Sequence, residues 1–283
     1  MKVVATALTT LVLTTGALAP AGAAPMSYVS LGDSYTAAPL VLPTAPGAPP
    51  DCLRSAINYP HLTAAALGLT LSDRSCSSAT TANMTTAQYL DQPPQFQALR
   101  ASTAVVTIGI GGNDNQLFLS AIIACSVTDA LDLLNIGAPC RSLFGDFFTN
   151  EVAADAPVIG AALAGIHLRS PAAAVFVVGY PDILPQQGSC YPQLPLTTGD
   201  IAYLNGVELA LNAMLQREAA AQGANYVDTY STSVGHDACK SIGARWIEPL
   251  IPNGAFPIHP NSKGEAADAR AVASALRAAG IRR

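Results

Sequence analysis

The chain has 283 residues, of which 50% are apolar and 12% are charged, and its formal net charge at pH 7 is −5. This balance permits a large buried core and excludes an intrinsically disordered chain. The sequence contains no run of Lys or Arg, so no nucleic-acid partner and no basic docking patch for an anionic membrane are expected. The length suits one sizeable α/β domain.

The N-terminal segment has the composition of a secretory signal peptide. A positive residue precedes an uncharged, mostly apolar run over residues 3–18, and the sequence AGA at residues 21–23 is typical of a cleavage site. We therefore expect a signal peptide over residues 1–23, cleavage near Ala23, and a secreted single domain over residues 24–283. An uncleaved membrane anchor is the alternative, but the run is short for a bilayer span of about 20 residues, and no later stretch is predicted to span a membrane.

The six cysteines indicate disulfides, because an even number is typical of chains that fold in an oxidising compartment. Six cysteines allow 15 pairings, among which the sequence alone does not choose. We expect sequential pairing, since it closes three separate local loops. The expected disulfides are Cys52–Cys76, Cys125–Cys140 and Cys190–Cys239. A metal site is the competing interpretation, but no CxxC or HxxxH spacing is present, so neither a metal nor another cofactor is expected.

Strand-like and helix-like stretches alternate along the chain. Apolar, β-branched runs cover residues 27–31, 69–74, 105–108, 174–178 and 226–229. Helical periodicity covers residues 57–67, 117–134 as a broken stretch, 152–168, 201–221 and 261–279. Segments rich in Pro and Gly predict loops over residues 42–51, 181–198 and 247–260. The alternation predicts a parallel sheet covered by helices on both faces, with its active site at the carboxyl ends of the strands.

The first predicted strand leads into the sequence GDSY, which places Ser34 between a strand and a helix. A serine hydroxyl at this position is exposed at the sheet edge, and helix N–H groups point toward it. Gly32 permits the sharp turn that this placement needs. Because Asp and Ser are also common turn and N-cap residues, the tripeptide alone does not establish catalysis.

The third predicted strand leads into IGIGGND, where Asn113 follows the glycines. Its side-chain amide is placed to donate to an oxyanion, and one such donor contributes about 3–4 kcal/mol of transition-state stabilisation in other acyl-transfer enzymes. The alternative interpretation is that Asn113 and Asp114 cap the following helix. The two interpretations are compatible, with Asp114 as the cap and Asn113 facing the site.

The sequence has four histidines as candidates for a general base. His61 lies within a helical stretch and is expected to be structural, and His167 ends a helix and is expected to be solvated. His236 precedes Cys239 and is expected to organise a loop. His259 lies in a loop just before the last helix, where it is able to take the proton from Ser34. His259 is therefore the predicted base.

In combination, these blocks resemble the SGNH/GDSL hydrolase family over about residues 27–280. The sequences GDSY at residues 32–35, GND at 112–114 and HPN at 259–261 follow the order and spacing of that family. Residues 76–81 resemble the block that normally carries the family glycine. GYP at residues 179–181 and GHDAC at residues 235–239 are similar to stretches in a secreted bacterial branch with three disulfides.

The resemblance implies a flavodoxin-like three-layer α/β/α sandwich around a five-stranded parallel sheet, and hydrolysis of carboxylic esters. It also implies an oxyanion hole formed by the N–H of Ser34, an N–H of the block at residues 76–81 and the side chain of Asn113. The chain has no G-x-S-x-G sequence, which argues against the ordinary α/β-hydrolase fold.

Two positions depart from the family pattern. Ser78 stands where the family glycine is expected, so its backbone N–H is retained while a side chain crowds the site. Phe256 stands where many members place an aspartate three residues before the histidine, so His259 lacks the usual carboxylate. Because Phe256 precedes Pro257, it is biased to an extended conformation, and its main-chain carbonyl is expected to support His259. Asp237 is the alternative partner.

These observations predict a secreted serine esterase that uses Ser34 and His259 for two-step acyl transfer onto water, with a small-molecule or lipid ester as substrate. We expect a monomer. One alternative is a lipase or phospholipase that acts at lipid interfaces. Another is a non-catalytic secreted protein of the same fold that binds carbohydrate or a surface. The sequence contains no pattern that indicates the acyl chain length or the alcohol half of the ester.

Overall fold

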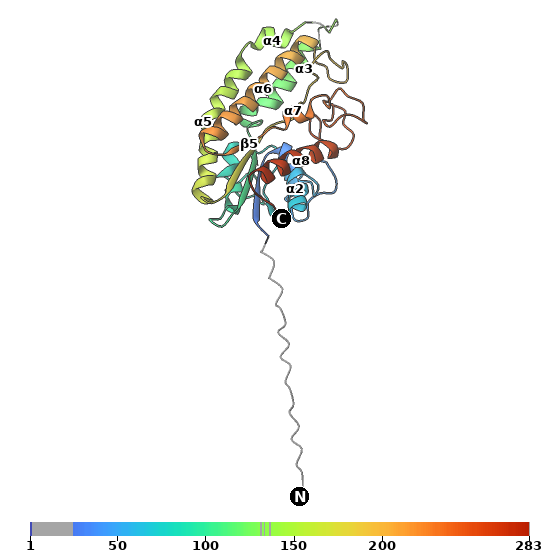
Figure 1. Cartoon of the computed structure of the whole chain (residues 1–283). Helices are drawn as coiled ribbons and strands as arrows, with labels where there is room; N and C mark the ends of the chain where they lie inside the picture. Colours follow the sequence, from blue (N-terminus) through green and yellow to red (C-terminus); the bar gives the residue numbers. More distant parts are fainter. Residues whose placement is uncertain (2–24, 131, 133, 136, 283) are drawn as a thin grey trace.

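The computed structural model describes residues 1, 25–130, 132, 134–135 and 137–282. The predicted signal peptide and its cleavage site fall on residues 2–24 and so lie outside the described residues. The described residues form a parallel sheet between two layers of helices (Figure 1).

The sheet has five parallel strands in the order β2-β1-β3-β4-β5. They are β1 (Ser27–Gly32), β2 (Thr70–Asp73), β3 (Val105–Gly109), β4 (Ala174–Val178) and β5 (Asn225–Val227). Each begins and ends within two residues of a predicted run. The central strands β1, β3 and β4 are almost wholly buried, as is expected for a parallel sheet that is covered on both faces.

Alternate side chains of the strands belong to two different hydrophobic clusters, one on each face of the sheet. In β4, Val175 and Val177 belong to the larger cluster, whereas Phe176 and Val178 belong to the smaller one. This alternation follows from the two-residue repeat of a strand. The fold is therefore the predicted three-layer α/β/α sandwich.

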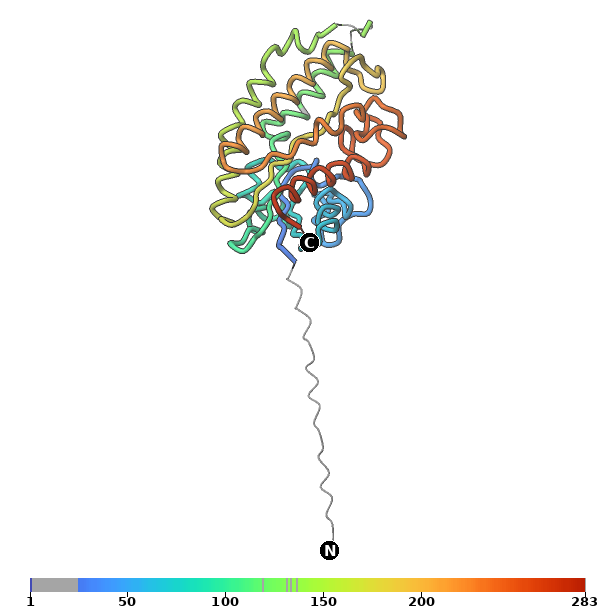
Figure 2. The backbone as a smooth tube through the Cα atoms, viewed as in Figure 1, coloured from blue at the N-terminus to red at the C-terminus, as the bar shows by residue number. Residues whose placement is uncertain are grey.

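The helices are α1 (Ser34–Ala37), α2 (Tyr59–Leu67), α3 (Leu117–Asp129), α4 (Pro139–Phe144), α5 (Phe147–Arg169), α6 (Thr198–Ala221), α7 (Tyr230–Ser233) and α8 (Ser262–Ala278). Short 3₁₀ helices cover Pro50–Cys52, Thr81–Met84, Gln95–Ala98 and Asp114–Gln116. Helices α2 and α8 lie side by side on one face, although they come from opposite ends of the chain (Figures 1 and 2). Helices α3, α5 and α6 form the other layer.

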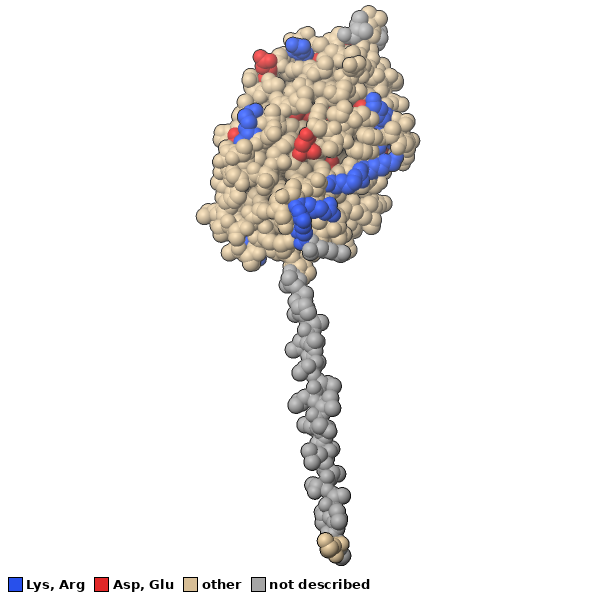
Figure 3. All heavy atoms as spheres, viewed as in Figure 1, with Lys and Arg blue, Asp and Glu red and all other residues tan. Residues whose placement is uncertain are grey.

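Helix α5 has the length and composition of a membrane span, whereas no such stretch was expected after the N-terminal segment. Within the described residues it is the one helix that is long and apolar enough to cross a membrane, judged by length and composition alone. Its side chains Ile159, Leu163 and Ile166 are buried in the larger hydrophobic cluster, and the helix packs against α6. These contacts bury one side of α5 within the domain. Uncharged residues also make up most of the face shown in Figure 3.

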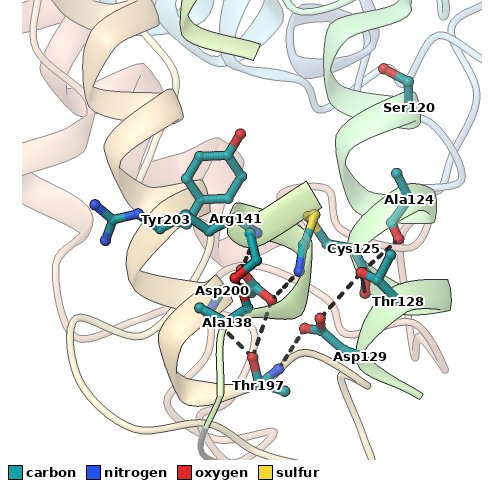
Figure 4. The surroundings of a disulfide bond; sticks show 12 residues. Ser120, Ala124, Cys125, Thr128, Asp129, Ala138, Arg141, Thr197, Asp200 and Tyr203 are labelled. Carbon is teal, nitrogen blue, oxygen red and sulfur yellow. Dashed lines mark hydrogen bonds between the residues drawn. A yellow bond between two sulfur atoms is a disulfide. The ribbon is translucent and has the colours of Figure 1, made fainter. Parts of the chain in front are cut away.

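The three disulfides join the cysteines in the expected pairs, Cys52–Cys76, Cys125–Cys140 and Cys190–Cys239. The second joins α3 to α4, a helix that the sequence did not predict. Helix α4 starts at a proline, and its first N–H groups, those of Cys140 and Arg141, each donate at 2.8 Å to the carboxylate of Asp200 on α6 (Figure 4). The cap of α4 thus comes from a residue 60 positions away, which local sequence patterns do not reveal.

Beside this disulfide, α3 is also connected to the start of α6. The carboxylate of Asp129, the last residue of α3, accepts a hydrogen bond from the N–H of Thr197 at 2.7 Å (Figure 4). Thr197 in turn caps α6 through its side chain, which accepts from the N–H of Asp200. Because these groups are buried, their contacts fix α3 and α6 relative to each other.

Candidate active site

Ser34 is the first residue of α1 and lies directly beyond the carboxyl end of β1. Asp33 caps this helix, since its side chain accepts from the N–H of Tyr35 at 2.9 Å, and its own N–H donates to the carbonyl of Gly109 on β3 at 3.0 Å. A Cβ on Gly32 would lie 2.6 Å from that same carbonyl, so only glycine fits there. The register of the sheet, which pairs Gly32 with Gly109, therefore positions Ser34.

His259 lies in the loop before α8, and its Nε2 is 2.8 Å from Oγ of Ser34. The two residues are 225 positions apart in the sequence. The structure thus brings together the predicted nucleophile and the predicted base at hydrogen-bonding distance, as proton transfer between them requires.

The carbonyl that supports His259 belongs to Pro257, which corrects the expectation for Phe256. Nδ1 of His259 is 2.7 Å from the Pro257 oxygen, whereas the Phe256 oxygen accepts from the backbone N–H of His259 at 3.3 Å. The reason is the left-handed conformation of Ile258, with φ of +60°, which turns the chain back under the imidazole. A carbonyl only accepts hydrogen bonds, so it selects the tautomer with the proton on Nδ1 and leaves the lone pair of Nε2 toward Ser34.

The alternative partner of His259, Asp237, is engaged elsewhere. Its carboxylate accepts from the N–H of Cys239 at 2.9 Å and lies 3.2 Å from Nζ of Lys240. No hydrogen bond joins it to His259 among the described residues. The support of the imidazole is therefore a main-chain carbonyl and not a carboxylate.

Burial lowers the pKa of His259 to about 4, while the carbonyl of Pro257 acts in the opposite direction. The imidazole is therefore neutral at pH 7, the form that is able to accept a proton from Ser34.

The loop that carries His259 is held by contacts that the sequence analysis did not find. Tyr35, the residue after Ser34, donates from Oη to the carbonyl of Ile258 at 2.6 Å. The backbone of Glu248 pairs with the same loop, because its N–H donates to the carbonyl of His259 and its own carbonyl accepts from Ile258. No local signal in the sequence identifies these partners, since the two segments joined by Tyr35 are 223 positions apart.

The carboxylate of Glu248 is buried and fully engaged. It pairs with the guanidinium of Arg245 at 2.6 Å and accepts from the N–H of Asn253 at 2.8 Å and from the side chain of Asn261 at 3.0 Å. Asn261 also caps α8. The carboxylate therefore connects the histidine loop to the start of the last helix.

Asn113 follows β3 and lines the same cavity as Ser34 and His259. Its side-chain amide donates to the carbonyl of Ala79 at 3.1 Å, which orients its NH₂ group. Contrary to the expectation of a helix cap, the carboxylate of Asp114 instead accepts from the N–H and the hydroxyl of Thr81 at 3.0 and 2.8 Å. Asp114 therefore connects the segment at residues 112–114 to the segment at residues 76–81.

Two backbone N–H groups complete the polar part of the cavity. The N–H groups of Ser34 and Ser78 have no hydrogen-bond partner within the described part of the chain. Ser78 is exposed and has a left-handed backbone with φ of +64°. This backbone conformation explains why SGNH/GDSL hydrolases normally have a glycine at this position. Free N–H groups beside a nucleophile are the donors that an oxyanion needs.

Tyr180 connects the segment at residues 32–35 to the segment at residues 112–114, and the sequence did not identify it as a site residue. Its hydroxyl donates to the carboxylate of Asp33 at 2.5 Å and accepts from the N–H of Gly112 at 2.7 Å. Burial raises the pKa of Asp33 to about 7, although this hydrogen bond lowers it. Gln95 adds a second connection by bonding both the N–H and the carbonyl of Gly32 at 2.8 and 2.9 Å.

Two of the other histidines have structural contacts, as expected. Nδ1 of His61 lies 2.6 Å from Oδ1 of Asn58, the cap of α2. His236 stacks on Trp246 with ring centroids 3.8 Å apart, and its Nδ1 lies 2.6 Å from the carbonyl of Ala244. Within the part of the chain that the structure describes, no cluster of His, Cys, Asp and Glu is arranged to hold a metal ion.

The cavity next to Ser34 has a volume of about 410 Å³ and mostly apolar walls. Its polar residues include Ser34, Ser78, Asn113 and His259. The apolar walls come from α3, α6 and the loop after β4, and include Phe118, Ala121, Ile122, Ile183, Leu184, Leu204 and Val207. An apolar cavity with a few converging polar groups is the usual form of a small-molecule site.

Comparison with known proteins agrees with this geometry. Residues 30–267 match the GDSL-like lipase/acylhydrolase family. Lipase 2 of Streptomyces coelicolor is 45% identical over 252 residues, which cover 87% of this chain and 85% of the relative. Two solved structures are similar at 26% and 28% identity with TM-scores of 0.72 and 0.71, phospholipase A1 of Streptomyces albidoflavus and an extracellular lipase of Streptomyces rimosus.

The chain covers 99% of each of those two structures, which in turn cover 89% and 88% of it. The match to the family includes the carboxyl end of β1, the strands β2 to β5, and the segments that carry Ser34, Ser78, Asn113 and His259. The chain therefore belongs to the GDSL-like lipase/acylhydrolase family and is a carboxylic ester hydrolase.

Proposed function

We propose that the protein is a serine esterase in which Ser34 is the nucleophile and His259 the general base. The observation that carries this proposal is the 2.8 Å contact between Nε2 of His259 and Oγ of Ser34 at the edge of a cavity that fits an organic ester. Substrate binding places the ester carbonyl over Ser34, with its carbon chain along the apolar walls.

In the first step, Oγ of Ser34 attacks the ester carbonyl carbon while Nε2 of His259 takes the hydroxyl proton. The oxyanion that forms accepts hydrogen bonds from the N–H groups of Ser34 and Ser78 and from the side chain of Asn113. The protonated imidazole is stabilised by the carbonyl of Pro257 at Nδ1. The bond to the alkoxy group then breaks, and His259 returns its proton to the leaving alcohol.

In the second step, His259 takes a proton from water, and the resulting hydroxide equivalent attacks the acyl group on Ser34. The same three donors hold the second oxyanion. Collapse of this intermediate releases the carboxylic acid and returns the proton to Oγ of Ser34. The two steps together consume one ester and one water molecule and regenerate the enzyme.

The test is hydrolysis of p-nitrophenyl esters by the wild type and by Ser34→Ala and His259→Ala. Because the two residues act as one unit, each substitution is expected to reduce kcat by at least about 10⁴-fold. The matched control is Ser241→Ala, an exposed serine outside the cavity, which is expected to keep full activity. The assignment of the nucleophile is wrong if Ser34→Ala keeps most of the activity or still reacts with a fluorophosphonate probe.

A lipase that acts at lipid interfaces is the second candidate. It is favoured by apolar side chains that remain exposed in or close to the His259 loop, such as Phe256 at 43% and Ile251 at 84% exposure. The similarity to two lipases and a phospholipase also favours it. This candidate predicts a jump in rate when the ester concentration exceeds the aggregation threshold. A soluble-substrate esterase shows saturation below that threshold and no jump.

We further propose that the protein is exported and that residues 1–23 are removed as a signal peptide. The composition of that segment supports this proposal, as do the three disulfides, which are typical of oxidising compartments. Mass spectrometry of the protein from the culture medium tests the proposal, since a mature N-terminus near Ala24 is expected. A full-length chain that is retained in the cell contradicts it.

A further inference from the structure

Glu208 on α6 is a buried carboxyl group in the wall of the apolar cavity that contains Ser34. Only 3% of the residue is exposed. Its Oε2 accepts a long hydrogen bond of 3.4 Å from the N–H of Ile183, and its Oε1 has no partner among the described residues. A buried carboxyl oxygen without a partner is costly, so its place in a substrate cavity needs an explanation.

The surroundings favour the neutral form of this side chain. Burial, together with the nearby carboxylate of Asp182, raises the pKa of Glu208 well above its usual range. A neutral carboxylic acid has one O–H donor in addition to its acceptor oxygens. Because Oε2 already accepts from Ile183, Oε1 is the oxygen that carries the proton. Glu208 therefore offers an unused hydrogen-bond donor in an otherwise apolar wall.

Glu208 also shares its cavity with the reacting atoms. Ser34, the proposed nucleophile, and Tyr35, the residue after it, line the same cavity as Glu208. The neighbours of Glu208 in the cavity wall, Leu204 and Val207, come from the same helix. A substrate chain that lies along α6 therefore passes this carboxyl group.

We propose that Glu208 is a specificity-determining residue and that the cavity takes acyl chains with a second oxygen atom, a hydroxyl or a carbonyl, a few carbons from the scissile ester. This inference rests on the proposed esterase function. The acyl half is the half concerned, since it stays bound to Ser34 after the alcohol has left. A chain oxygen at the right position pairs with Oε1, whereas a plain alkyl chain leaves that group without a partner.

The experiment compares p-nitrophenyl octanoate with its 4-, 5-, 6- and 7-oxo derivatives, which share chain length and leaving group. The wild type is expected to prefer one oxo isomer over octanoate by about tenfold in kcat/KM, because the unpaired carboxyl is satisfied only by that isomer. Glu208→Met replaces the carboxyl by an apolar chain of similar length. It is expected to abolish this preference and to raise hydrolysis of octanoate several-fold.

Glu208→Gln is the rescue variant, because its amide keeps a donor and an acceptor in the same place. It is expected to retain most of the preference for the oxo isomer. Glu218→Met and Glu218→Gln on the same helix are the matched controls, since Glu218 does not line the cavity, and both are expected to keep the wild-type ratio.

The outcomes separate this inference from the esterase proposal. Hydrolysis that survives in Ser34→Ala contradicts the esterase proposal itself. Hydrolysis that depends on Ser34 but shows the same oxo-to-alkyl ratio in wild type and Glu208→Met overturns the inference alone, and Glu208 is then a structural residue. If Glu208→Met does not fold, the wild type alone still tests the inference on Glu208. A wild type that prefers octanoate to every oxo isomer overturns that inference.

Discussion

Ser34 and His259 meet in one cavity, but different kinds of contact hold them there. Ser34 depends on the main chain, through the paired ends of β1 and β3 and the turn at Gly32. Its surroundings are further fixed by the disulfide between Cys52 and Cys76, since the N–H of Cys76 donates to the carbonyl of Gly32. Regular backbone hydrogen bonds in a buried sheet make this half of the site rigid.

His259 depends on side chains as well as on backbone hydrogen bonds. Its loop belongs to no strand, and it is held by the hydroxyl of Tyr35 and by Glu248, whose carboxylate connects Arg245, Asn253 and Asn261. Each of these side-chain contacts is open to removal by one substitution, whereas the backbone pairing of Glu248 with Ile258 and His259 is not. We therefore expect point mutations to displace the histidine half of the site more readily than the sheet half.

Of the substitutions that test this comparison, the one at Asn113, which lies on the sheet side of the cavity, is expected to have the largest effect. Asn113→Ala removes one proposed donor to the oxyanion and is expected to reduce kcat by about 10²- to 10³-fold with little change in KM. The control is Asn150→Ala, because Asn150 is exposed on α5. Steady-state kinetics with p-nitrophenyl butyrate measure the effect. A loss of less than about fivefold removes Asn113 from the oxyanion hole.

A smaller effect is expected from the ion pair that anchors the histidine loop. Glu248→Gln leaves the buried guanidinium of Arg245 without its counter-charge, and this is expected to cost about 3 kcal/mol of unfolding free energy and about tenfold in kcat. Glu151→Gln on α5 is the control for the chemical change. Denaturant unfolding and kcat are measured on the same preparations. An unchanged kcat shows that the loop keeps its position without this pair.

Tyr35→Phe tests a single contact of the histidine loop, since it removes only the hydroxyl that donates to the carbonyl of Ile258. A hydrogen bond of this kind contributes about 1 kcal/mol, so kcat is expected to fall about fivefold while the sheet keeps its stability. Tyr191→Phe, at an exposed tyrosine, is the control. If Tyr35→Phe changes KM and not kcat, the hydroxyl contributes to binding and not to the position of His259.

The smallest effect is expected from moderate acidification. The neutral imidazole is the active base, and burial lowers the pKa of His259 to about 4, so the rate falls only as the pH approaches that value. Between pH 8 and pH 5.5, kcat/KM is therefore expected to change by less than about twofold. A histidine with the usual pKa of about 6.5 predicts a loss of about tenfold over the same range. The pH dependence of kcat/KM for an uncharged ester distinguishes the two.

The elements that the sequence predicted correctly are those with a repeating local signal. The five strands lie where apolar, β-branched runs occur, and α6 and α8 lie where the helical periodicity is longest. Helices α4 and α7 were not predicted, because they have six and four residues and α4 is capped by the distant Asp200. Helix α5 begins five residues earlier than its periodicity predicted.

The sequence by itself determined the α/β class, the alternation of strands and helices, and the candidate residues Ser34, Asn113 and His259, because short-range periodicity and strand-end motifs are properties of neighbouring residues. Only the tertiary structure decided that Pro257, and not Phe256, supports the histidine, and that Tyr180, Glu248 and Glu208 belong to the site. The contacts of Tyr180 and Glu208 join segments far apart in the chain, whereas the choice of Pro257 depends on the left-handed backbone of Ile258 in a loop that packs after the sheet has formed.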